Sequence, residues 1–385
     1  MTPAIARSIP FFDYSSVFTG DEDELVRIFR DVGRRGAFIL QEDVFRFEKN
    51  LASFLGAGFA VGVGNATDGL LIALRAAGIG PGDEVIFSSH TMVATAAAIH
   101  FSGATGVPVE CGADHLIDPS AVAEAVTERT RAILVTQLNG RTADMDALGE
   151  IVERHGLILI EDAAQALGAK FQGRSGGTFG VAAAFSFYPA KTLGCLGDGG
   201  AVVTGDSAMH ERVLELRNHG KSVAGATAGW GWNSRLDNLQ AAILDHRLEH
   251  YPKVIARRRA IAAQYHHWLR DLDELVLPPG PNSGTNFGTN FGTNNDTRHF
   301  DVFQNYEIEA EFRDELRAFL SACGIGTLVP WGGKAVHQCE GLGFRVRLPR
   351  TEKLFERLLL LPLNLALADD ENDYNAAPVK AFYRR

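Results

Sequence analysis

One lysine in this sequence is held in a context that suits chemistry better than solubility. Lys191 follows a short apolar run that begins at Phe185, and the glycine-rich segment 194–200 comes directly after it. This pattern predicts a turn between two buried strands. A lysine amine held in such a turn can act as a nucleophile and form an imine with an aldehyde.

Asp162 is the partner that the sequence offers to this lysine. It ends the apolar run 157–160, and ligands of open α/β sheets collect beyond the carboxyl ends of the strands. A buried carboxylate there requires a cation, and the protonated ring nitrogen of pyridoxal 5'-phosphate (PLP) supplies one. The alternative is a helix N-cap before residues 163–166, but the lysine downstream favours the cofactor interpretation.

Further side chains complete a candidate PLP site. In segment 61–69 a strand is followed by a helix start, where the backbone N–H groups of Ala66 and Thr67 can bind a phosphate. The hydroxyl of Ser186 can reach the same phosphate. Gln165, one helical turn past Asp162, faces the phenolic oxygen of the ring.

Two other interpretations of segment 61–69 stay open. It partly resembles the dinucleotide fingerprint, with Gly62 and Gly64, but Thr67 replaces the third glycine. A dehydrogenase that uses a nicotinamide cofactor is therefore a rival hypothesis. A plain tight turn with Thr67 as the N-cap is the other.

The remaining motifs point away from other chemistries. His246 and His250 match the zinc pattern H-x-x-E-H, but they lie in a long charged helix without an evident third ligand, so we expect no metal. Neither a Gly-x-Ser-x-Gly elbow nor a P-loop occurs.

Composition indicates an ordinary globular protein. The 385 residues are 46% hydrophobic and 22% charged, and the net charge of −10 argues against a nucleic-acid surface. Four cysteines without C-x-x-C spacing suggest reduced thiols, and Cys195 near Lys191 is expected to be inert. There is no signal-peptide pattern and no apolar run of membrane-spanning length, so we expect a cytoplasmic protein without nucleic-acid or membrane partners.

Periodicity predicts an α/β fold with a mostly parallel sheet covered by helices on both faces. We expect residues 1–245 to form an N-terminal arm and a large domain. Residues 246–385 would form a smaller α+β domain with a long bridging helix over 238–269. Segment 278–295 has low complexity and is expected to be an exposed loop. The predicted strands are 59–63, 84–87, 106–109, 132–136, 157–160, 200–204 and 306–310; the other predicted helices are 21–35, 41–55, 69–77, 94–101, 119–126, 146–155, 209–216, 313–323 and 352–359.

Taken together, the motifs resemble the DegT/DnrJ/EryC1/StrS family of PLP-dependent sugar aminotransferases. The resemblance runs over roughly residues 36–363, and its strongest stretches keep their order and spacing: 36–40, 80–85, 161–165, 185–191, 197–204 and 217–220. It implies fold type I, with a seven-stranded sheet in the large domain.

The resemblance also implies roles for individual residues. Lys191 would form the imine and move the proton, Asp162 would pair with the ring nitrogen, and Gln165 with the ring hydroxyl. Asn233, in segment 232–235, would cross to the cofactor phosphate of a neighbouring subunit. The active unit would then be a homodimer with the site at its interface.

Three positions depart from the family pattern. Met92 stands where an aromatic residue commonly covers the ring, although a thioether can also cover a π-face. Leu167 stands where a histidine is frequent, and the late histidine motif has become segment 330–337. Tyr188, Lys334 and His337 are therefore our candidate substrate residues.

The leading hypothesis is amino transfer from glutamate to a nucleotide-linked keto-sugar, with ping-pong kinetics. A PLP-dependent sugar dehydratase on the same fold is an alternative, but the resemblance implies a histidine in place of Lys191 for that reaction. A non-catalytic regulator on this fold is disfavoured by the full set of lysine, aspartate and phosphate-binding residues.

Overall fold

The computed structural model describes residues 7–222, 224–281 and 297–384. Its centre is a seven-stranded sheet in the order β1-β9-β8-β5-β4-β2-β3, in which only β9 runs antiparallel to its neighbours. The sheet is thus mostly parallel, as its apolar strands predict. These strands are β1 (Phe59–Val63), β2 (Glu84–Ser88), β3 (Thr105–Val109), β4 (Thr130–Thr136), β5 (Ile158–Asp162), β8 (Ala182–Ser186) and β9 (Gly200–Thr204).

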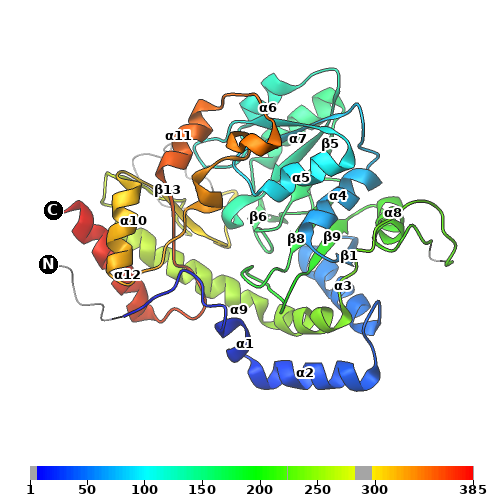
Figure 1. The fold of residues 1–385 in the computed structure, drawn as a ribbon, viewed down its shortest axis with the longest axis horizontal. Coiled ribbons are helices and arrows are strands. Elements are labelled where there is room, and N and C mark those ends of the chain that lie inside the picture. The colour runs from blue at the N-terminus through cyan, green and yellow to red at the C-terminus, as the bar shows by residue number, and fades with distance from the viewer. Residues whose placement is uncertain (1–6, 223, 282–296, 385) are drawn as a thin grey trace.

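Helices cover both faces of this sheet (Figure 1). Strand β8 shows the period of two that makes this possible, because Ala182 and Ala184 face one core while Ala183 and Phe185 face the other. One face packs against α4 (Ala66–Ala76), α5 (Val93–Ser102) and α8 (Ser207–Arg217). The other packs against α3 (Glu42–Leu55), α6 (Pro119–Ala125), α7 (Met145–His155) and the start of α9 (Asn238–Leu269).

A second, smaller sheet lies beside the far end of α9. Its strands β10 (Leu275–Val276), β12 (Tyr306–Ala310) and β13 (Leu358–Leu361) are antiparallel. Around them lie α10 (Arg313–Ala322), α11 (Pro349–Arg357) and α12 (Asp369–Tyr383) (Figure 1). The remaining elements are α1 (Ser16–Thr19), α2 (Glu22–Arg35), the short strands β6 (Lys170–Phe171), β7 (Arg174–Ser175) and β11 (His299–Phe300), and four 3-10 turns, η1 (Leu138–Gly140), η2 (Pro330–Gly333), η3 (Val336–Gln338) and η4 (Glu340–Leu342).

The long helix α9 belongs to both parts of the molecule. Ile255 packs in a core of the large sheet, whereas Ile261 packs in the core of the small sheet. The boundary that we expected after residue 245 therefore falls inside this helix. The N-terminal segment, which we grouped with the large domain, also bonds to the small part, because Ile9 N donates to Gly324 O at 2.8 Å.

Two local differences from the predicted elements have clear causes. Helix α4 begins at Ala66 rather than residue 69, because the side chain of Asn65 accepts a hydrogen bond from Asp68 N at 2.9 Å. Asn65, not Thr67, is therefore the N-cap. The helix predicted over 352–359 ends at Arg357, since the leucines of β13 pair with β12 instead. Most of the low-complexity segment 278–295 lies outside the described residues.

Candidate active site

The turn that carries Lys191 is held from both parts of the molecule. Lys191 N donates to Tyr188 O at 2.8 Å, which closes the turn. The next residue, Thr192, is bonded through its N–H to Gln304 Oε1 at 2.9 Å and through its hydroxyl to Tyr251 OH at 2.6 Å. Burial lowers the pKa of Lys191 to about 8, although the nearby Asp162 opposes this. The turn is thus held in place, and the amine that it carries is easily made neutral.

Asp162 ends the central strand β5 and is buried. Its carboxylate accepts hydrogen bonds from the hydroxyl of Thr95 at 2.6 Å and from Ala164 N at 3.2 Å. Burial raises the pKa of this carboxyl, and these bonds and the Lys191 charge offset it only in part. The chain after Asp162 is a turn and not the helix considered as the alternative. The carboxylate is therefore available for a cation above it.

Thr95 is a residue that the sequence reasoning missed. It lies in the first turn of α5, where its hydroxyl also contacts Thr91, and Thr91 contacts Thr136 at the end of β4. Thr91 and Thr136 thus orient the hydroxyl of Thr95, which bonds to Asp162. Buried threonines near strand ends carry no distinctive sequence pattern, so tertiary packing alone reveals this role.

The predicted phosphate site comes together at the start of α4. Ser186 pairs with Gly200 across β8 and β9, and a Cβ added to Gly200 would lie only 2.8 Å from Ala66 N. Glycine at 200 is therefore what allows β9 to approach the helix start. Ser186, Ala66 and Thr67 surround one helix N-terminus, where backbone N–H groups and the helix dipole favour an anion.

A cleft with a volume of about 540 Å³ opens above Lys191 and is lined also by Tyr188 and Gln165. We expected Gln165 to follow Asp162 along a helix, but residues 163–166 form a turn instead. Its Oε1 accepts from Asn139 N at 2.8 Å. A further wall comes from the N-terminal segment, whose aromatic residues Phe11, Phe12 and Tyr14 the sequence reasoning passed over.

The other predicted residues lie in different surroundings. Met92 caps α5 and is 46% exposed, within one turn of Thr95. Asn233 and Lys334 are exposed and do not line the cleft. His337 is buried away from it, where its Nδ1 contacts Ser89 Oγ at 2.7 Å.

Two side expectations concern metal and thiol chemistry. The ligand atoms of His246, Glu249 and His250 lie within 4.8 Å of one another on α9, but His246 Nε2 is hydrogen-bonded to Asp21 at 2.8 Å. We add no metal to the proposed chemistry. Burial raises the pKa of Cys195 to about 12, which keeps this thiol protonated near Lys191.

The geometry contradicts the dehydrogenase hypothesis. β1, which carries Gly62, is an edge strand whose neighbour β9 is antiparallel, whereas a dinucleotide fold places this strand inside a parallel sheet. The N–H of Gly62 is also occupied, since it donates to Glu48 Oε1 at 2.7 Å.

The residues present fit PLP. A buried carboxylate lies at a strand end, a lysine with a lowered pKa faces the same site, and the start of α4 offers a phosphate cradle. Lys191 would hold the aldehyde, Asp162 the ring nitrogen, and Ser186 with Ala66 and Thr67 the phosphate. Fold and site together define a PLP-dependent transferase of fold type I.

Comparison with known proteins identifies the family. The chain belongs to the DegT/DnrJ/EryC1/StrS aminotransferase family, whose model matches residues 20–380. Enzymes of this family use PLP, so the chain is a PLP-dependent aminotransferase.

Three similar proteins illustrate the range of this family. A dTDP-3-amino-3,4,6-trideoxy-alpha-D-glucose transaminase of Streptomyces venezuelae is 42% identical over 361 residues, covering 92% of this chain and 91% of its own. A pleiotropic regulatory protein of Geobacillus stearothermophilus is 38% identical over 382 residues, covering 98% and 99%. The crystal structure of S. venezuelae DesV superposes with a TM-score of 0.92 at 39% identity, covering 99% of this chain and all of that one.

Proposed function

We propose that the protein transfers an amino group from glutamate to a nucleotide-linked keto-sugar in two half-reactions that share one cleft. The observation that carries this proposal is Lys191 at the floor of that cleft, with the buried carboxylate of Asp162 close enough to oppose the lowering of its pKa. The sugar substrate is supported by relatives such as the S. venezuelae transaminase.

Lys191 performs the proton transfer in this proposal. When bound, PLP acts as an electron sink for the carbanion formed at the donor's Cα. Lys191 would hold the cofactor's aldehyde until the donor's amine replaces it, and its Nζ would then accept the proton from the donor's Cα and later give it back. Its pKa of about 8 leaves an appreciable fraction neutral near physiological pH, which a proton acceptor requires.

Asp162 and its hydroxyl partner Thr95 hold the charge of the ring. Because Asp162 is anchored by the 2.6 Å bond from Thr95, it needs no reorganisation during the reaction. The second half-reaction returns the amino group to the sugar carbonyl by the same contacts in reverse, which is the basis for ping-pong kinetics.

We further propose that the protein works as a cytoplasmic homodimer with Asn233 at the subunit interface. Trp230 is 98% exposed, and Trp232, beside Asn233, is exposed too, as are Phe38 and Phe45. Exposed aromatic side chains of this kind are favourable interface residues. The four cysteines are unpaired, which suits a reducing compartment. No helix in the described ranges is long and apolar enough to cross a membrane.

The test follows the two half-reactions separately. Glutamate added to the PLP-loaded protein should change its visible absorbance and release 2-oxoglutarate, and a nucleotide-linked 3-keto-sugar should restore the first spectrum. Lys191→Ala should slow both by about 10⁴-fold, whereas the matched control Lys170→Ala, which changes an exposed side chain of β6, should not. A glutamate response with no response to any keto-sugar would reject the sugar substrate and keep the donor chemistry.

A further inference from the structure

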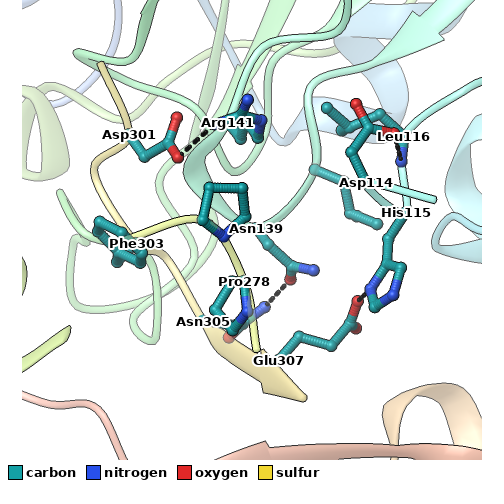
Figure 2. Close-up of a pocket in the computed structure, with 12 residues that line it drawn as sticks. Asp114, His115, Leu116, Asn139, Arg141, Pro278, Asp301, Phe303, Asn305 and Glu307 are labelled. Carbon is teal, nitrogen blue, oxygen red and sulfur yellow. Dashed lines mark hydrogen bonds and ion pairs between the residues drawn. The ribbon is translucent and has the colours of Figure 1, made fainter. Parts of the chain in front are cut away.

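Three polar side chains form a wall of the cleft that the proposed chemistry does not use. Asn139, Asn305 and Glu307 line both the cleft of Lys191 and a second cavity of about 40 Å³ behind it (Figure 2). That second volume holds on the order of one water molecule. The wall is therefore polar on both of its sides. Packing alone does not explain this, because apolar side chains would fill the same space.

Glu307 is a permanent hydrogen-bond acceptor in this wall. It is 3% exposed, and its Oε1 accepts from His115 Nδ1 at 2.8 Å, while its Oε2 lies 3.6 Å from His90 Nε2. Burial alone would raise the pKa of this carboxyl, but the two histidines outweigh burial and lower it. The carboxylate thus stays ionised, and its Oε2, 3.6 Å from His90 Nε2, is the less tightly held of its two oxygens.

The two asparagines supply the complementary groups. Asn305 Nδ2 donates to Asn139 Oδ1 at 2.8 Å, as Figure 2 shows, and Gln165 Oε1 takes the N–H of Asn139. These bonds occupy the side-chain oxygen of Asn139 and the amino group of Asn305. The amino group of Asn139 and the oxygen of Asn305 are the groups left to meet a ligand.

We propose that this wall selects a keto-sugar that carries a hydroxyl on a carbon next to the reacting carbonyl. The hydroxyl would donate to Glu307 and accept from Asn139, since a hydroxyl is the small group that does both. This inference rests on the proposed function and names the substrate class for the same site.

The expected effect is large enough to measure. A site with buried polar groups that bind a hydroxyl strongly rejects the analogue that lacks it, because those groups are left unpaired. For this largely buried wall we expect a loss of about tenfold to a hundredfold in kcat/KM.

The experiment compares nucleotide-linked 3-keto-sugars that retain both neighbouring hydroxyls with their 2-deoxy and 4-deoxy counterparts. In the native enzyme at least one deoxy compound should react ten to a hundred times more slowly than the parent. In Glu307→Gln and in Asn305→Leu this discrimination should fall by tenfold or more. The glutamate half-reaction should stay within about twofold, which separates recognition from damage to the fold.

Matched controls keep the outcome clear. Glu311→Gln removes an exposed carboxylate that follows the same strand and should change nothing. Asn305→Leu leaves the Glu307–His115 pair intact and carries the test if Glu307→Gln folds poorly. Equal rates for parent and deoxy sugars in the native enzyme, or discrimination that persists in both variants, would overturn the inference. Failure of every keto-sugar alongside a normal glutamate response would overturn the sugar function as well.

Discussion

Two groups of charges lie at the same cleft, and their surroundings shift the pKa values of their carboxylates in opposite directions. At the floor, Asp162 is held by a hydroxyl and a backbone N–H, and burial raises its pKa while it lowers that of Lys191 to about 8. At the wall, Glu307 is held by His115, and the pKa of Glu307 is lowered while that of His115 rises to about 9.

The difference separates a site for chemistry from a site for recognition. At the floor, the charge of Asp162 is compensated only in part, so a positively charged ligand group binds more favourably there. At the wall, His115 supplies the counter-charge, so the carboxylate of Glu307 stays ionised whether or not a ligand is bound. A residue that transfers protons needs an environment like the floor, where its pKa is shifted toward neutral pH. A residue that binds a hydroxyl needs an environment like the wall, where its charge does not change.

The largest effect should come from removing the charge at the floor. Asp162→Asn keeps the size of the side chain but cannot balance a protonated ring nitrogen, so we expect kcat to fall by about a hundredfold or more. Equilibrium affinity for PLP should fall as well, which gives a readout independent of turnover. Asp198→Asn, an exposed change in the loop after Lys191, is the control. Near-native turnover in Asp162→Asn would remove the contrast between floor and wall.

A smaller effect should appear in the stability of the wall as pH changes. Burial alone would lower the pKa of His115, but Glu307 and Glu309 outweigh it and raise the pKa from 6.5 to about 9. The stabilisation is therefore complete below pH 6.5 and is lost as the pH rises to 9. It is on the order of 3 kcal/mol.

Denaturant unfolding at several pH values measures this loss. The free energy of unfolding should fall between pH 6.5 and 9 in the native protein, and the slope should flatten in His115→Gln. Since the pKa of Glu307 is lowered, its contribution is instead lost on the acid side, as the pH falls below 4.5. Equal slopes in both proteins would show that His115 is not charged by its carboxylate neighbours.

The smallest effect is a shift in the pH midpoint at which Lys191 captures PLP. Burial lowers the pKa of Lys191, so its amine is neutral above about pH 8 rather than above 10.5. The rate at which the cofactor-free protein captures PLP should therefore rise with pH and level off above pH 8. Stopped-flow absorbance gives this profile, and a midpoint near 10.5 would mean that Lys191 is solvated.

Much of the floor could be predicted from the chain alone. The apolar run before Asp162, the glycines after Lys191 and the small residues before α4 are local patterns, and a PLP site is the one interpretation that accounts for all three together. The family resemblance then assigned roles to residues already singled out, and the family model confirms the membership. The mostly parallel sheet also followed from the alternation of buried strands and helices, whereas its seven strands were implied by the family resemblance.

What the sequence by itself determined is the class of chemistry, because a lysine, a carboxylate and a phosphate cradle are each encoded within a few neighbouring residues. Only the tertiary structure decided what surrounds them. Thr95, in the first turn of α5, bonds to Asp162 at the end of β5. His115, which follows β3 of the large sheet, bonds to Glu307 in β12 of the small sheet. Such contacts depend on how helices and sheets pack, and no local period in the chain records them.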